Sequence, residues 1–442
     1  IIPLSEVKWA RKYIAPKKRG KVPTGVDQLL QVGDVVYVAP RPEEDPDANK
    51  KKKKKVVEVL PDGEPVWRLM QFPEVSGGII AMDPHTGRVH ALVGGFSFDE
   101  SEFDRVVQAR RQPGSSLKPF VYAAALDNGY TPVSVVLDGP IAIPQANGDI
   151  WKPKNYGKSF YGPSTLRLGL EKSRNLMTVR LAQDMGMPMI SEYARRFGIY
   201  DNLSPVLSMS LGAGETTLLR MTRAYSMLAN GGKTIRATLI DRIQDRYGRT
   251  IWRHDIRKCP DCQAEGWNGQ PEPLLADDRR QIVDPHTAYQ ITSMLEGVVK
   301  RGTGAKIKKI VRHPLAGKTG TTNEEKDAWF VGFTPDLTVG VYIGFDNPSP
   351  MGKGETGGGL AAPIFADFMK HALSEKEPIP FRVPPGIDLI PVDAKTGQQV
   401  ASRRGAILEA FKPGTGPADD INVIGVQNGP EYWNRPEPGG LY

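Results

Sequence analysis

The chain has 442 residues, 39% of them hydrophobic, so it can bury a large core and form two or three domains. Its 58 basic and 50 acidic residues give a net charge of +8, which suits an anionic polymer or a membrane surface as a neighbour. The sequence has no zinc-finger or RNA-recognition signature, so we expect no nucleic-acid partner.

The sequence begins Ile1-Ile2-Pro3, without methionine or a signal peptide, and has no apolar stretch approaching the length of a membrane span. We therefore expect a fragment of a longer chain, with no membrane-spanning segment of its own.

Residues 1–75 predict a small β-rich module. Its strand candidates are residues 35–38, 56–60 and 66–70, with a Pro-Asp-Gly turn signal between the last two. Between the first two lies an acidic block followed by six lysines, Lys50 to Lys55. Such a charge run is typical of a solvated loop and, less often, of an arm that binds polyanions or partners.

A β-hairpin is predicted next, from residues 78–82 and 88–93 around the five-residue turn 83–87. The chain then reaches R-R-Q-P-G-S-S-L-K-P-F-V-Y at residues 110–122. Pro113 and Gly114 interrupt whatever precedes them, and an apolar helix-forming run follows. Ser115 is therefore expected where a helix begins, with Lys118 one turn later on the same face.

Ser115 and Lys118 predict a serine–lysine acylation site. A serine hydroxyl is a poor nucleophile at neutral pH and needs a base within hydrogen-bond reach. A lysine three positions on can be that base if burial or a neighbouring cation favours its neutral form.

Residues 115–309 are expected to be mostly helical, because residues 165–185 and 216–228 carry apolar residues at helical spacing. Ser173-Arg174-Asn175 falls inside the first of these runs. By itself, this tripeptide is typical of a polar helix start or an interhelical turn.

The only cysteines, Cys259 and Cys262, stand in C-P-D-C. This spacing suits a redox pair, half a zinc site or a structural loop. Because a closed zinc site needs four ligands and only His254 and Asp255 are near in sequence, we favour the structural loop and expect neither a metal nor a cofactor.

Three more strands are predicted at residues 315–321, 328–333 and 337–345, followed by a helix at residues 361–373. Strands from the two ends of this region should form one sheet around the helical insertion, so that the Lys318 strand can face the Ser115 helix. Beyond about residue 375 the chain is rich in Pro and Gly, which indicates an extended, partly ordered tail wrapped on the main domain.

Context separates the motif copies. S-x-x-K also occurs at residues 5–8, without a Pro-Gly break or a strong helix, and K-T-G also occurs at residues 395–397, where the tail looks like an ordinary turn. Ser115 and Lys318 are therefore the favoured copies. S-x-x-K, S-x-N and K-T-G are each weak alone, but in this order and on these elements they are jointly strong.

Six stretches carry a resemblance to a known family: residues 111–120 (R-Q-P-G-S-S-L-K-P-F), 151–156 (W-K-P-K-N-Y), 162–167, 211–215, 317–322 and 327–333. Over residues 76 to about 375 the chain resembles the transpeptidase half of class A penicillin-binding proteins, in particular the 1a type of Gram-negative bacteria. The resemblance implies an α+β penicillin-binding/serine β-lactamase-like fold. That fold is a five-stranded antiparallel sheet covered by helices, with an all-helical subdomain. Residues 1–75 resemble part of an OB-like domain, and residues 376–442 would be a C-terminal extension.

The resemblance also implies roles. Ser115 would attack the penultimate D-alanine carbonyl of a peptidoglycan stem peptide, and Lys118 would take its proton, although the acylation base is disputed for this fold class. Ser173 would relay a proton to the leaving nitrogen, and Asn175 would hold the substrate's amide. Lys318 would keep the site electropositive.

Substrate binding is assigned by the same resemblance to the Lys318 strand. Thr319 and Thr321, with Gly320 between them, would bind the terminal carboxylate. The backbone N–H groups of Ser115 and Thr321 would form an oxyanion hole.

The implied activity is that of a serine-type D-Ala-D-Ala transpeptidase in a bifunctional peptidoglycan synthase. Its partners would be stem peptides as acyl donor and amine acceptor, β-lactam antibiotics and other cell-wall synthesis proteins. It would act on the periplasmic side of the bacterial inner membrane, with the anchor and glycosyltransferase domain preceding Ile1. The alternatives are a D,D-carboxypeptidase or β-lactamase, or a non-catalytic β-lactam sensor or scaffold. A β-lactamase is disfavoured because class A enzymes have an E-x-x-L-N sequence, whereas the sequence that starts at Glu215 is E-T-T-L-L and lacks the asparagine.

Overall fold

The computed structural model describes residues 1–15, 18–40, 66–145, 147–257, 266, 268–269, 277, 279–402, 405–417 and 422–426. The chain divides into two compact units, Ile1–Glu74 and Val75–Tyr442. The Lys50–Lys55 run, the strand predicted at residues 56–60 and both cysteines lie outside the described residues.

In its described residues, 1–15, 18–40 and 66–74, the first unit contains two antiparallel strand pairs and two short 3-10 helices. Its elements are η1 (Leu4–Glu6), β1 (Tyr13–Ala15), β2 (Lys18–Arg19), η2 (Val26–Gln28), β3 (Tyr37–Pro40) and β4 (Trp67–Met70). β1 pairs with β2, and β3 pairs with β4. The strands predicted at residues 35–38 and 66–70 are therefore present, with β3 displaced by two residues.

The second unit is built on one five-stranded antiparallel sheet, in the order β13-β14-β15-β5-β6. Its strands are β5 (Ser76–Met82), β6 (Val89–Val93), β13 (Ala316–Thr321), β14 (Asp327–Phe333) and β15 (Thr338–Gly344). Strands from the two ends of the region thus meet in one sheet, as predicted, and β13 lies at one edge of it.

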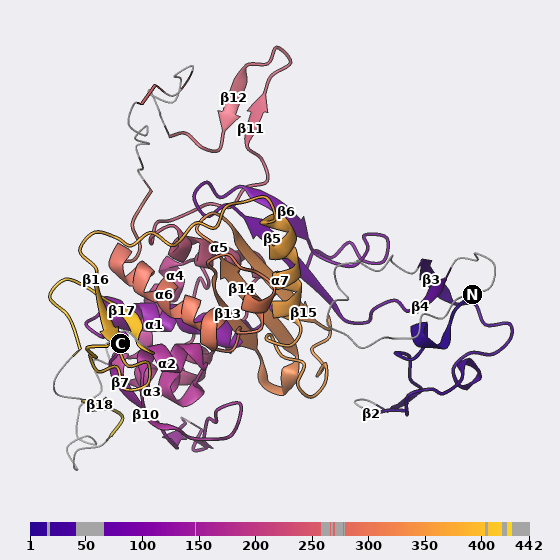
Figure 1. The fold of residues 1–442 in the computed structure, drawn as a ribbon, viewed down its shortest axis with the longest axis horizontal. Coiled ribbons are helices and arrows are strands. Elements are labelled where there is room, and N and C mark those ends of the chain that lie inside the picture. The colour runs from indigo at the N-terminus through magenta and orange to yellow at the C-terminus, as the bar shows by residue number, and fades with distance from the viewer. Residues whose placement is uncertain are drawn as a thin grey trace. The chain divides into compact units, whose positions relative to one another are not determined.

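Both faces of this sheet are covered by helices (Figure 1). Side chains alternate across a strand, and Phe330 of β14 points toward α7 (Ala361–Ala372), where its ring lies 4.6 Å from that of Phe365. Its neighbours on β14, Trp329 and Val331, belong to the other core cluster, which the remaining helices complete. Because both faces are buried, every residue of β14 is buried.

The helical half is arranged around α1, in which every residue from Lys118 to Leu126 is buried. The helices of this half are α1 (Lys118–Asp127), α2 (Leu166–Glu171), α3 (Asn175–Met185), α4 (Met187–Arg196), α5 (Leu218–Ala229) and α6 (Pro285–Arg301). Among the described residues, no helix is long and apolar enough to cross a bilayer.

The prediction of one continuous helix at residues 165–185 is wrong in one respect, because the helix is interrupted between α2 and α3. Ser173 has a φ of +57°, a left-handed conformation that a helix cannot contain. The Asn155 side chain accepts a hydrogen bond from the Asn175 N–H at 2.8 Å and caps the start of α3. This cap comes from a distant loop, so apolar spacing within residues 165–185 could not reveal it.

The remaining strands form small sheets around the helical half and one projecting hairpin, β11–β12 (Figure 1). These strands are β7 (Val135–Asp138), β8 (Ile143–Pro144), β9 (Ile150–Trp151), β10 (Gly162–Thr165), β11 (Arg242–Gln244), β12 (Thr250–Arg253) and β18 (Val423–Ile424).

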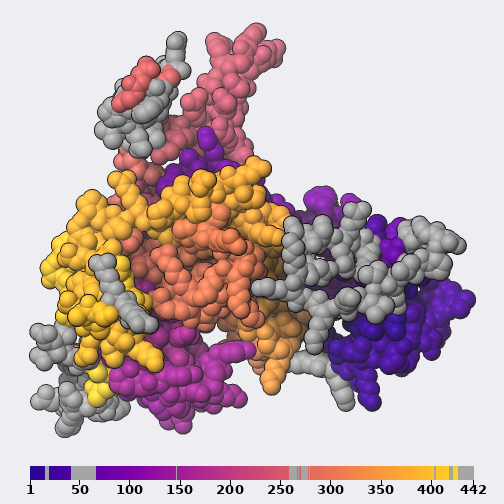
Figure 2. All heavy atoms as spheres, viewed as in Figure 1, coloured from indigo at the N-terminus to yellow at the C-terminus, as the bar shows by residue number. Residues whose placement is uncertain are grey.

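The segment after residue 375 runs over the surface of the second unit, as expected (Figure 2). It is more regular than its composition predicts, because β16 (Asp388–Val392) and β17 (Ile407–Phe411) form an antiparallel pair. Glu409 of β17 is fully buried and forms an ion pair with Arg167 of α2. A buried carboxylate needs such a partner, so this contact fixes the tail to the helical half.

Candidate active site

The turn that carries Ser115 is the 3-10 helix η4 (Gly114–Leu117), which leads directly into α1. Gly114 has a φ of +52°, and a Cβ at this position would lie 2.7 Å from the carbonyl oxygen of Thr321. On the facing strand, a Cβ at Gly320 would overlap the Pro113 carbonyl oxygen and the Ser116 Oγ. Glycine at both positions therefore lets η4 lie directly against the edge strand β13.

Accessibility separates the two adjacent serines of η4. Ser115 is partly exposed, whereas Ser116 is completely buried. The Ser116 backbone carbonyl is held by the Tyr225 hydroxyl at 2.8 Å. Only Ser115 is thus available to a substrate, in agreement with its position three residues before Lys118.

Ser173 lies between two buried lysines. Lys318 donates a hydrogen bond to its Oγ at 2.9 Å. Lys118 donates to the Ser173 carbonyl at 2.8 Å, to its Oγ at 3.4 Å and to the Asn175 Oδ1 at 2.7 Å. The left-handed backbone at Ser173 is what presents both its carbonyl and its hydroxyl to these ammonium groups. Residues from α1, the α2–α3 break and β13 therefore meet at one point.

Both lysines are fully buried, and burial is the main cause of their depressed pKa values. The pKa of Lys318 falls to about 7. Burial lowers the pKa of Lys118 well below its ordinary value, the charges of Lys318 and Arg174 lower it further, and Asp138 opposes the shift. The site therefore favours a neutral lysine three residues after Ser115, and the neutral form is the one that can accept a proton.

Two residues without a role in the sequence analysis support this arrangement. Asn155 accepts from the Asn175 N–H and donates from its Nδ2 to the Asp138 Oδ1 at 2.7 Å. Asp138 is completely buried at the end of β7, with Arg174 Nε 3.6 Å from its Oδ2. Asn155 lies in the W-K-P-K-N-Y stretch, one of the six stretches that resemble the family, so the sequence pointed to its region. No sequence pattern pointed to Asp138.

The hydroxyl groups on β13 already have partners. Thr319 Oγ1 lies 2.7 Å from Thr303 Oγ1, and Thr321 Oγ1 accepts from the Gly357 N–H at 3.0 Å. These bonds fix both side chains beside Gly320 on the strand that faces η4. The proposed substrate-binding residues Thr319, Gly320 and Thr321 are thus brought together with Ser115, Ser173 and Lys318.

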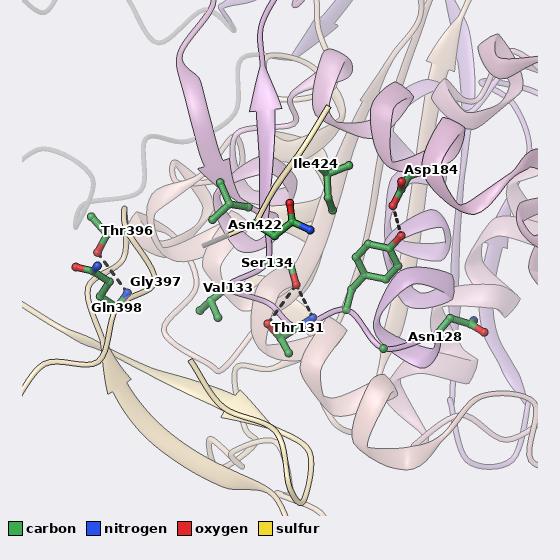
Figure 3. A pocket seen from close by; sticks show the side chains of 13 residues that line it. Asn128, Thr131, Val133, Ser134, Asp184, Thr396, Gly397, Gln398, Asn422 and Ile424 are labelled. Carbon is green, nitrogen blue, oxygen red and sulfur yellow. Dashed lines mark hydrogen bonds between the residues drawn. The ribbon is translucent and has the colours of Figure 1, made fainter. Parts of the chain in front are cut away.

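The second K-T-G copy lies elsewhere, in a turn where Asp393 accepts from the Lys395 and Thr396 N–H groups. Thr396 and Gly397 line a hollow of about 490 Å³ that none of the favoured motif residues lines (Figure 3). Tyr130 and Asp184 also line it and are hydrogen-bonded to each other, and Asp184 lies on the side opposite Thr396. The prediction of an ordinary turn at residues 395–397 is confirmed.

Glu215 is exposed in the segment before α5 and lies near Tyr200, whose pKa is raised mainly by burial and further by the Glu215 charge. In the part of the chain that the structure describes, no carboxylate is hydrogen-bonded to Ser115, Lys118, Ser173 or Lys318. The described site therefore contains no carboxylate bound to these groups that could activate a water molecule.

Comparison with known proteins gives two family matches. Residues 77–370 match the penicillin-binding protein transpeptidase domain, and residues 1–75 match the penicillin-binding protein OB-like domain. The chain belongs to the penicillin-binding protein transpeptidase family. The α+β fold with an OB-like leading module, expected from the sequence, is thereby confirmed.

Several relatives match most of this chain. The chain is 45% identical to penicillin-binding protein 1A of Rickettsia bellii over 93% of its length, and 36% identical to that of Pseudomonas aeruginosa over 92%. The crystal structure of penicillin-binding protein 1A from Haemophilus influenzae superposes with a TM-score of 0.70 at 32% identity, covering 80% of this chain and 55% of that one. The chain spans about half the length of the curated relatives it matches, 48% and 51% respectively.

Proposed function

We propose that this chain is the acylating part of a serine-type D,D-transpeptidase that cross-links peptidoglycan stem peptides. The observation that carries the proposal is the meeting of two buried lysines on Ser173, beside an accessible Ser115 on a turn pressed against β13. A nucleophile, a base with a lowered pKa and a second hydroxyl are the parts that covalent acyl transfer needs.

In the acylation step, Ser115 Oγ attacks the carbonyl carbon of the penultimate D-alanine, and neutral Lys118 takes its proton. The amide C–N bond then breaks, and the terminal D-alanine leaves after its nitrogen receives a proton through Ser173. In the second step an amine of another stem peptide attacks the ester carbonyl, the C–O bond breaks, and a proton returns to Ser115 Oγ.

The remaining residues bind and orient the substrate in this proposal. Asn175 holds the substrate's amide, Thr319 and Thr321 bind its terminal carboxylate beside Gly320, and Lys318 supplies positive charge. The backbone N–H groups of Ser115 and Thr321 stabilise the oxyanion of the tetrahedral intermediate. The short separation between Gly114 and Thr321 supports this assignment, because it brings the two N–H groups to the same end of β13.

Because the chain spans half of its relatives, the activity of the whole protein is part of the same proposal. We place it in a bifunctional peptidoglycan synthase on the periplasmic side of the inner membrane, with β-lactams as inhibitors and other cell-wall synthesis proteins as partners. Within it, residues 1–75 form the OB-like module, residues 76–375 the transpeptidase domain and residues 376–442 the extension.

The test is intact mass after incubation with a penicillin, followed by peptide mapping of the adduct. We expect one adduct, on Ser115, and no adduct on the Ser115→Ala variant. Ser116→Ala is the matched control and should still be acylated at Ser115. An adduct on Ser116, or normal labelling of Ser115→Ala, would contradict the assignment. A folded protein that is never labelled would instead indicate a scaffold.

The lifetime of the adduct separates transpeptidase from hydrolase. Hydrolysis of the ester needs a base that holds a water molecule on the acyl carbon, and the missing general-base contribution should slow deacylation by roughly 10²–10⁴-fold. We therefore expect the penicilloyl adduct to persist for hours, as followed by mass spectrometry. Rapid return of free protein with opened penicillin would identify a β-lactamase-type hydrolase.

A further inference from the structure

A loop at residues 151–161 presents basic and aromatic side chains beside the active site. It reads W-K-P-K-N-Y-G-K-S-F-Y and contains three lysines and no acidic residue. Lys152, Lys154 and Lys158 are exposed, and Tyr156 and Tyr161 are 67% and 54% exposed. Within the described residues, none of these three lysines forms a salt bridge. The Tyr161 ring is already covered by the Arg174 guanidinium, 3.3 Å from its centroid. The loop therefore offers a ligand the positive charge of its lysines and the exposed ring of Tyr156.

The inner side of this loop is part of the site already described. Asn155 is buried and bonded to Asp138 and to the Asn175 N–H. The Lys154 carbonyl accepts from the Asn175 Nδ2 at 2.8 Å. A ligand held by this loop would therefore lie close to Asn175.

Tyr156 reaches from this loop to the turn that follows β13, where its hydroxyl donates to the Glu325 Oε1 at 2.9 Å. Glu324 and Glu325 have φ values of +62° and +52°, which are unfavourable for residues with a Cβ. The Tyr156 hydroxyl thus already binds a carboxylate, and that carboxylate is presented by a strained turn. A carboxylate of a bound peptide can take the place of this side chain on the Tyr156 hydroxyl.

We propose that residues 151–161 bind the acceptor stem peptide through a carboxylate that displaces Glu325 from Tyr156, an inference that rests on the proposed transpeptidase function. The donor's terminal carboxylate is already assigned to Thr319 and Thr321 on β13. The loop lies against Asn175 and reaches the turn after β13 through Tyr156, so its carboxylate site is separate from the Thr319 and Thr321 hydroxyls. Its lysines match a peptide that carries negative charge. The acceptor is the second peptide that the reaction needs.

The experiment measures how the acyl-enzyme divides between water and an amine. The protein is acylated with a small D-alanyl thioester and offered a peptide with one free amine and a terminal carboxylate, or the same peptide as its terminal amide. The ratio of aminolysis to hydrolysis does not depend on the rate of acylation. We expect the preference for the carboxylate peptide to fall about 3–10-fold in Tyr156→Phe and in Lys152→Ser/Lys158→Ser.

Glu325→Gln should act in the opposite direction and lower the acceptor concentration needed for half-maximal aminolysis, because a neutral amide competes less well for the loop. A purely structural role of the Tyr156–Glu325 bond would move both variants in the same direction, which would overturn the proposal. Lys370→Ser/Lys376→Ser, which removes two exposed lysines from α7 and the residues after it, is the charge-matched control and should change nothing.

A rise in the KM of the thioester donor at unchanged partition would assign the loop to the donor and also overturn the proposal. Wild-type protein that neither thioester nor penicillin acylates would contradict the proposed function itself. In that case calorimetry of the same two peptides with Ser115→Ala still decides the inference, since it requires no chemistry. Tighter binding of the carboxylate peptide, lost in Lys152→Ser/Lys158→Ser, supports it, and equal binding of the two peptides overturns it.

Discussion

The two K-T-G tripeptides of this chain have the same sequence and opposite surroundings. Lys318 lies on β13 with its side chain fully buried, and its ammonium group donates to the Ser173 Oγ. Lys395 lies in a turn of the C-terminal segment with its side chain exposed. Burial lowers the pKa of Lys318 to about 7.

The difference shows that the lowered pKa of a lysine comes from the residues packed around it in space and not from the residues next to it in sequence. Burial removes the water that stabilises an ammonium ion, and a nearby hydroxyl then becomes its polar partner. The turn at residues 394–397 provides neither, since the Asp393 carboxylate accepts only from N–H and hydroxyl groups of the turn. The following experiments compare the two copies or the surroundings of Lys318.

The largest effect is expected from removing the two lysines in turn. Lys318→Ala should slow acylation by penicillin by roughly 10–150-fold, because a charged hydrogen bond in a buried site contributes about 1.5–3 kcal/mol. Lys395→Ala should be nearly silent. Stopped-flow acylation with a fluorescent penicillin measures both. Equal losses in the two variants would mean that the choice of K-T-G copy is wrong.

The two glycines should separate activity from stability. Gly320→Ala places a methyl group against the Pro113 carbonyl and the Ser116 Oγ, so η4 must move, at about 1–3 kcal/mol. Acylation by the folded protein should fall about tenfold or more. Gly397→Ala has a φ of +75° and would place its Cβ 2.7 Å from that of Val133, so it should cost about 1–3 kcal/mol of unfolding free energy and leave acylation unchanged. Urea unfolding and labelling of the same samples test this, and a fully active Gly320→Ala protein would contradict the close approach of η4 and β13.

The pH dependence of acylation should report the charges around Lys118. These charges are Lys318 on β13, Arg174 before α3 and Asp138 on β7. If neutral Lys118 is the base, acylation falls as the pH drops through its pKa. Asp138 raises that pKa, so Asp138→Asn should move the acidic limb to lower pH. Asp393→Asn, beside the other K-T-G copy, should leave the limb in place. A limb that moves to higher pH in Asp138→Asn would exclude Lys118 as the group that titrates.

The last effect concerns stability alone. The pKa of Lys318 is about 7 in the folded protein and near 10.5 when the chain is unfolded, so the unfolded state binds more protons between these values. Its contribution is fully present above the unfolded pKa and is lost as the pH falls toward 7. From pH 7 to 9 the unfolding free energy of wild type should rise by about 1 kcal/mol per pH unit more than that of Lys318→Met. Parallel curves would show that Lys318 is not desolvated.

Much of the architecture could be predicted from the sequence, because its determinants are local. Turn residues and alternating apolar runs placed β5, β6, β13, β14 and β15, and Pro113-Gly114 followed by an apolar run placed the start of α1. Motif order and context also distinguished Lys318 from Lys395. These features depend on residues a few positions apart, and the preference of such residues for a turn, strand or helix can be recognised within one short stretch of sequence.

Only the tertiary structure decided how the site is assembled. The helix break at Ser173 has no Gly or Pro to announce it, and it persists because Lys118, Lys318 and the Asn155 cap hold it from three other parts of the chain. The proline content of its segment gave no sign of the β16–β17 pair. The ion pair that fixes this segment, Arg167–Glu409, joins residues 242 positions apart. Buried hydrogen bonds and charges of this kind join residues far apart in sequence, so periodicity and spacing carry no record of them.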